Sequence, residues 1–172
     1  LTELDRWILH EFSALEQEVL RAFDNHDFHV IYQRVSQFVA VELSSIYHDI
    51  VKDRLYTDAA NSNRRRSTQT ALHRMVTSLC TMLSPTLVFT ADEAWEYVPG
   101  KKVASAHELI WKPLAFQSSE AERAIWKTAF DLRDMALPEL EKARQAKAIG
   151  KALEAKLTIA GPENALRLVE NH

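Results

Sequence analysis

Hydrophobic residues recur at helical intervals along most of this chain. Between Thr2 and about Phe23 they lie three, four and seven residues apart, which is typical of a helix that buries one face. Thr2 is placed to cap that helix, and Asp5 to neutralise its first turn. The residues expected to face the core are Leu4, Ile8, Leu15, Val19 and Ala22.

A second apolar pattern runs from Asp27 to about Leu55 without a glycine or proline. At ~1.5 Å per residue such a helix spans roughly 40 Å, so we expect an elongated helical bundle. The wide apolar face expected in its core comprises Phe28, Ile31, Tyr32, Val35, Phe38, Val39, Leu43, Ile46, Tyr47, Ile50 and Val51.

Further helices are expected after a polar turn over residues 56–63. One of them opens with a capping box, in which the Thr90 hydroxyl takes a first-turn amide and Glu93 reaches back. Residues 101–119 show no period and predict a loop that crosses the bundle. The expected helices are Arg64 to Leu83 (apolar face Leu72, Met75, Val76, Leu79, Met82 and Leu83), Thr90 to Tyr97, and Glu120 to Ala148, capped by Ser118 or Ser119 and bent at Pro138.

The pattern changes after Ile149-Gly150. Residues 155–159 alternate with period two and read as a strand, and a last helix is expected from Glu163 to Glu170. A lone strand is not stable, so we expect a truncated α/β appendage. The predicted class is all-α, with a helical bundle over residues 1–117. Residues 118–172 are expected to form a long helix that continues the bundle, followed by the start of a small α/β domain.

Composition argues against several functions. The net charge of −3 gives no overall attraction to nucleic acid, so any anion site must be a local patch. Three glycines leave no glycine-rich phosphate loop. Cys80 is the only cysteine and lies in an apolar stretch, which favours core packing.

No signal-peptide pattern or run of ~20 apolar residues occurs. His26 and His29 lack a third ligand, so we expect no metal site, and no catalytic set stands out.

The clearest local signal is basic and lies at the junction of the second and third helices. Cations flank an aromatic ring there, which suits phosphate contact and base stacking on a single-stranded loop. Three arginines at a helix N-terminus oppose its dipole unless an anion or Asp58 offsets them. A solvated turn, paired locally with Asp53 and Asp58, is the open alternative. The candidate residues are Lys52, Arg54, Tyr56, Arg64, Arg65, Arg66 and, further along, His73.

Five stretches also resemble a known family in order and spacing. The combination of KDRLY with RRR is its specific feature. The stretches are LDRWIL (Leu4–Leu9), VELSSIYHDIVKDRLY (Val41–Tyr56), RRRSTQTAL (Arg64–Leu72), LSPTLVFTADEAWEY (Leu83–Tyr97) and IGKALEAKLTI (Ile149–Ile159). They resemble bacterial-type isoleucyl-tRNA synthetases of class Ia. The resemblance implies a helical anticodon-binding bundle followed by a junction domain.

The same resemblance implies a partner and a parent enzyme. The partner is the anticodon stem-loop of isoleucine tRNA, contacted by the candidate residues, with no DNA or membrane involved. The parent attaches isoleucine to its tRNA using ATP, and many members carry zinc. Neither the ATP signatures nor the editing domain occurs here, so the chain is expected to be an inactive fragment without a cofactor. We also expect it to be monomeric and cytoplasmic. Its first residue, Leu1, fits a piece of a longer protein. A valyl-tRNA synthetase domain and a helical protein-interaction module remain alternatives.

Overall fold

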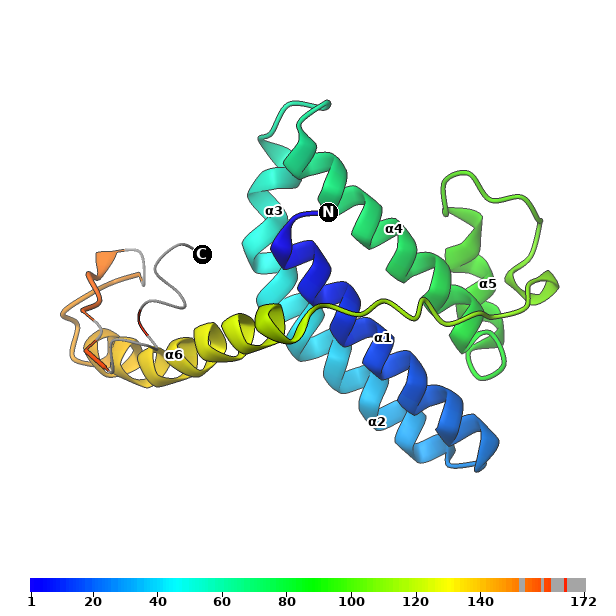
Figure 1. The fold of residues 1–172 in the computed structure, drawn as a ribbon, viewed down its shortest axis with the longest axis horizontal. Helices are drawn as coiled ribbons and strands as arrows, with labels where there is room; N and C mark the ends of the chain where they lie inside the picture. Colours follow the sequence, from blue (N-terminus) through cyan, green and yellow to red (C-terminus); the bar gives the residue numbers. More distant parts are fainter. Residues whose placement is uncertain (152–153, 159, 162–165, 167–172) are drawn as a thin grey trace. The chain divides into compact units, whose positions relative to one another are not determined.

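The structure is a computed structural model that describes residues 1–151, 154–158, 160–161 and 166. The chain divides into two compact units between Ser118 and Ser119, whereas the sequence placed a boundary one residue earlier. No strand occurs among the described residues, and helices make up most of each unit (Figure 1). The prediction of an all-α fold is therefore confirmed.

The first unit begins with two helices that lie side by side, α1 (Glu3–Asp24) and α2 (Phe28–Phe38). Helix α2 continues directly into the π-helical segment η1 (Val39–His48) and then into α3 (Asp49–Tyr56). The extent of the long second helix was therefore predicted correctly. The ten-residue π-helical centre was not, and its wider turns move side chains off a stripe of 3.6-residue period.

Helix α4 (Asn63–Leu83) runs back from the α3–α4 turn, and α5 (Val88–Glu96) and the 3₁₀ turn η2 (Ala106–Glu108) follow it. The capping box predicted at Thr90 is wrong. The helix begins earlier, at Val88, because the Ala91 amide already donates to the Leu87 carbonyl at 2.8 Å, and Thr90 lies inside the helix. A capping box does form further on, between Ser105 and Glu108.

The core of the first unit is built around α1, which packs against α2, η1 and α4. All five core residues predicted in this helix are at most 4% exposed. The face predicted for the second helix is only partly right. Ile31, Phe38, Tyr47 and Val51 are buried, whereas Phe28, Tyr32, Val39 and Ile50 are at least 40% exposed. Helix α1 covers one side of a helix whose apolar stripe is broader than that contact.

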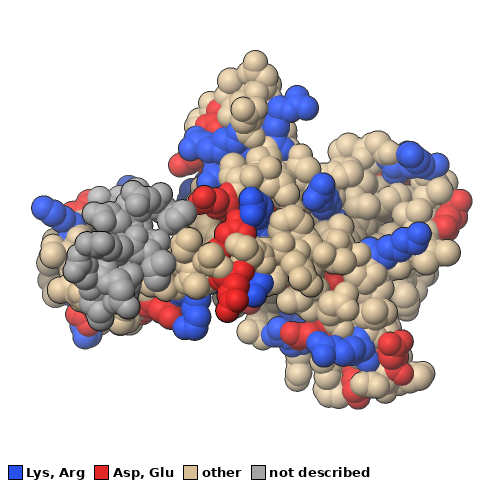
Figure 2. All heavy atoms as spheres, in the orientation of Figure 1, with Lys and Arg blue, Asp and Glu red and all other residues tan. Residues whose placement is uncertain are grey.

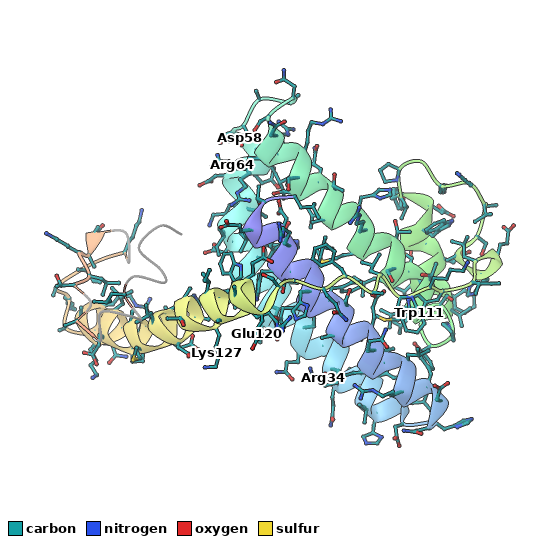
Figure 3. All side chains as sticks on the ribbon, viewed as in Figure 1. Arg34, Asp58, Arg64, Trp111, Glu120 and Lys127 are labelled. Atoms are coloured by element: carbon teal, nitrogen blue, oxygen red, sulfur yellow. The ribbon has the colours of Figure 1, made fainter. Side chains whose placement is uncertain are left out.

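Helix α1 also buries two carboxylates that the sequence did not predict, Asp5 and Glu16, both 0% exposed. Glu16 holds the loop that crosses the bundle, because it accepts hydrogen bonds from the Leu114 amide at 2.7 Å and from the Trp111 indole at 3.4 Å. The Ser78 hydroxyl also donates to it. Burial raises the pKa of Glu16 above its usual value. The predicted crossing loop is thus confirmed, and Figure 3 labels Trp111 on it.

The second unit consists mainly of α6 (Glu120–Gln145), which begins with a capping box between Ser119 and Glu122. Pro138 lies inside this helix without ending it. Residues 155–158 are described and are not a strand, so that part of the predicted α/β appendage is not found. A strand needs a hydrogen-bonded neighbour, and no described segment provides one. Residue 159 lies outside the described part of the chain, as does the helix predicted over 163–170 apart from residue 166.

Candidate nucleic-acid interface

The turn between α3 and α4 gathers most of the predicted binding residues at one end of the first unit. We call Lys52, Arg54, Tyr56 and Arg64–Arg66, with the turn between them, the basic tip. Helix α4 starts there with Ser62 as its cap, whose hydroxyl accepts from the Arg65 amide at 3.5 Å. Figure 2 shows Lys and Arg atoms around this turn, with acidic atoms beside them. The short connection therefore brings the two helix ends together, as the sequence predicted.

Asp58 accepts hydrogen bonds from two of the three arginines at the start of α4. The Arg64 guanidinium donates to both oxygens of the Asp58 carboxylate, at 2.9 and 2.6 Å (Figure 3). Arg65 donates to the Asp58 backbone carbonyl at 2.8 Å. The Arg64 hydrogen bonds hold the pKa of the Asp58 carboxyl below its usual value. The repulsion between the arginines and the helix dipole is therefore offset by Asp58, one of the two ways the sequence allowed.

The residues at the end of α3 differ in their availability. Lys52 pairs with Asp49 at 2.6 Å on the surface, and this contact raises the Lys52 pKa. The Arg54 side chain is only 16% exposed. It donates to the Thr2 hydroxyl at 3.2 Å and lies 3.9 Å from the Asp5 carboxylate. Tyr56, in contrast, is 86% exposed. Arg54 therefore belongs to the support of the basic tip, and Tyr56 to its surface.

Arg66 and His73 of α4 both border a groove of about 790 Å³. Within the described chain, the Arg66 guanidinium has no hydrogen bond or ion pair. The His73 ring donates from Nε2 to the Pro99 carbonyl at 2.9 Å. Burial lowers the pKa of His48, which also borders the groove. The remaining lining residues are Leu43, Gln69, Thr70, Leu72, Met75, Val76, Leu79 and Pro99.

Asp5 lies in the first turn of α1 after the Thr2 cap, as predicted. The sequence did not predict its burial or its partners. Its carboxylate accepts from Tyr47 at 2.7 Å, from Thr68 at 3.0 Å and from Thr2 at 2.6 Å. The Ser67 hydroxyl donates to it as well. Two features of the sequence could have indicated this contact. Asp5 is the single acid inside the LDRWIL stretch, and two hydroxyl residues, Ser67 and Thr68, directly follow the arginines.

The described residues hold no group of three or more His, Cys, Asp or Glu side chains that could bind a metal ion. No helix in this part of the chain is both long enough and apolar enough to cross a membrane. The features that stand out are therefore the basic tip, the groove beside Arg66 and the buried carboxylates of α1.

Comparison with known proteins identifies the family. Residues 5–159 match the family model described as the anticodon-binding domain of tRNA ligase. The isoleucine–tRNA ligase of Syntrophotalea carbinolica is 37% identical over the whole chain, which covers 19% of that protein. Those of Legionella pneumophila and Nitrosococcus oceani are 39% and 41% identical over 96% and 91% of the chain, and the chain covers 18% and 17% of them. The chain thus spans less than a fifth of these relatives, and it belongs to the anticodon-binding domain family of tRNA ligases.

Proposed function

We propose that this chain binds the anticodon stem-loop of isoleucine tRNA through its basic tip, as part of an isoleucine–tRNA ligase. The observation that carries the proposal is the composition of the tip. Four arginines, a lysine and an exposed tyrosine gather at one turn of a chain whose net charge is −3. Phosphate binding here depends on this local concentration of charge.

The contacts have different roles. Arg66 meets a phosphate directly, because its guanidinium is exposed and has no partner within the described chain. Arg64 exchanges the Asp58 carboxylate for a phosphate, since the guanidinium binds both anions in the same two-pronged way. Tyr56 offers its ring to an unstacked base of the loop, the mode in which single-stranded RNA is bound. Lys52 adds charge at the rim, and His73 extends the surface along the groove.

The wider reaction belongs to the full-length ligase. There isoleucine is joined to its tRNA with ATP, and this chain supplies affinity for the tRNA rather than chemistry. ATP, and zinc where a ligase carries it, are assigned to the rest of that enzyme and not to these residues. We place the protein in the cytoplasm as a monomer, with neither DNA nor a membrane as a partner.

The test is binding of the chain to anticodon stem-loops of isoleucine and valine tRNA, each measured at several salt concentrations. We expect preference for the isoleucine loop and an affinity that falls with salt, by a log–log slope of about −0.7 for each phosphate contact. Equal binding to both loops would contradict the assignment to isoleucine, and tighter binding to the valine loop would favour a valyl enzyme. Absence of binding at low salt would overturn the proposal and favour a protein-interaction module.

A single substitution localises the interaction. Arg66→Ala should reduce affinity by about fivefold at 0.1 M salt, the value of one contact of that slope. Arg21→Ala is the matched control, because Arg21 lies in the last turn of α1 and donates to the backbone of its own helix. Equal losses in the two variants would contradict binding at the basic tip.

A further inference from the structure

A single buried carboxylate joins the elements that carry the basic tip. Asp5, near the start of α1, accepts from Tyr47 of η1 and from Thr68 of α4, at 2.7 and 3.0 Å. The hydroxyl of Ser67, the residue directly after Arg66, also donates to it. The contact to α3 is made by Arg54, 3.9 Å away. The helix before the turn and the helix after it are therefore held by the same side chain.

The polar network around Asp5 is closed as well as buried. Asp5, Tyr47 and Thr68 are all 0% exposed. The Thr2 hydroxyl donates to Asp5 and accepts from Arg54, and the Thr2 amide donates to Ser67 at 2.7 Å. A carboxyl group in such a place is tolerated because its oxygens are hydrogen-bonded and the Arg54 guanidinium lies near. Burial, followed by the contact with Asp5, raises the pKa of Tyr47, so that phenol remains a donor.

We propose that Asp5 is a positioning residue for RNA binding, which sets the arrangement of the end of α3 against the start of α4 and hence of the arginines on the turn. The inference rests on the proposed function of the basic tip. Five cationic groups converge there and repel one another. Two of the acidic residues near the basic tip contact different helices. Asp58 binds arginines of α4, whereas Asp5 contacts residues of both α3 and α4.

The alternative is that Asp5 contributes only to the stability of the core. Helix α1 contains its own control for this possibility. Glu16 is buried to the same extent and accepts from Ser78 of α4, but it holds the crossing loop through Leu114 rather than the basic tip. Removing either carboxylate leaves buried or half-buried donors without an acceptor. Only the removal of Asp5 should alter the turn between α3 and α4.

The experiment compares Asp5→Asn with Glu16→Gln at a temperature where both variants are folded by circular dichroism. Asp5→Asn should weaken binding to the isoleucine anticodon stem-loop by at least about fivefold at 0.1 M salt, and make the salt slope shallower by about 0.7 for each phosphate that the variant no longer binds. Glu16→Gln should bind within about twofold of the parent. The sign is diagnostic, because removing a negative charge beside the basic tip would by itself strengthen RNA binding.

Amide hydrogen exchange gives a second readout that needs no RNA. Asp5→Asn should speed exchange at residues 57–66, where the Thr57 amide donates to Asp53 and the Ser62 amide to Ala59. Glu16→Gln should speed it at residues 109–118 instead. If the parent itself does not bind the stem-loop, the proposed function fails, and the exchange pattern still decides whether Asp5 positions the turn.

Two outcomes would overturn the proposal. One is a folded Asp5→Asn variant that binds RNA as tightly as the parent or exchanges normally at the turn. The other is an equal decrease of binding in Glu16→Gln. Should Asp5→Asn fail to fold, Thr68→Val removes one hydrogen-bond donor from Asp5, and Ser78→Ala removes one from Glu16. Thr68→Val should weaken RNA binding and Ser78→Ala should not. Equal RNA affinities of these two variants would again contradict the proposal.

Discussion

Replacing Asp58 with asparagine tests whether the chain carries an internal competitor for RNA. Asp58 engages two nitrogens of Arg64, at 2.9 and 2.6 Å, and 55% of the Arg64 side chain remains exposed. A phosphate must displace this carboxylate to bind Arg64 in the same way. Asparagine is nearly isosteric and keeps an acceptor for Ser62, but it has no charge. Arg64 then becomes available without a change in the shape of the turn.

The expected gain follows from counterion release. In the parent, Arg64 reaches its phosphate only by giving up Asp58, and Asp58→Asn removes this cost. The full value of one phosphate contact to a single strand is about 0.7 logarithmic units at 0.1 M salt, so Asp58→Asn should bind the isoleucine anticodon stem-loop up to about fivefold more tightly. The melting temperature should change little, because ion pairs at an exposed turn contribute little to folding.

Fluorescence anisotropy of a labelled stem-loop, titrated between about 0.05 and 0.3 M salt, measures affinity and slope together. Glu18→Gln is the matched control, since it removes the same charge and releases Arg34, whose ion pair joins α1 to α2. We expect the gain to disappear in the double variant Asp58→Asn/Arg64→Ala. A gain that persists without Arg64, an equal gain in Glu18→Gln, or weaker binding by a folded Asp58→Asn variant would show that Asp58 does not compete with RNA for Arg64.

Three further predictions concern the fold. Phe12 is fully buried, and its ring centroid lies 5.6 Å from that of Phe38. Phe12→Ala should therefore lower the free energy of unfolding, measured by urea titration, by about 3–5 kcal/mol. A decrease below about 1 kcal/mol would contradict the place of Phe12 in the core. Val39→Asp should change that free energy by less than about 1 kcal/mol, because Val39 is 40% exposed, and a variant that fails to melt cooperatively would contradict this. Because the Glu16 pKa is raised, its contribution to stability is complete below the usual value of 4.5 and is lost as pH rises through the raised value. The melting temperature of Glu16→Gln relative to the parent should therefore increase with pH, and a difference independent of pH would contradict the buried carboxyl.

Helix positions in the first unit could be predicted because they depend on contacts near in sequence. Apolar spacing located α1 and α4, and the absence of glycine and proline indicated one continuous helical stretch from α2 to α3. The crowding of cations at the α3–α4 turn was equally visible, because only a few residues separate the two helix ends. The stripe on α1 was assigned correctly since that helix is packed by α2, η1 and α4 and buries its whole apolar face.

Local sequence patterns were enough to place the helices and the positive charge, whereas the choice of buried helix faces depends on contacts between distant segments. On α4 the apolar residues Leu72, Val76 and Leu79 border an open groove. The small hydroxyl residues Ser67, Thr68 and Ser78 are buried instead. Their acceptors, Asp5 and Glu16, lie 62 or 63 positions away in sequence. A hydroxyl is buried favourably only when it finds such a partner, and no local pattern on α4 reveals that partner. The availability of each arginine is settled in the same way, since Arg54 is tied to the start of α1 and Arg66 is left to solvent.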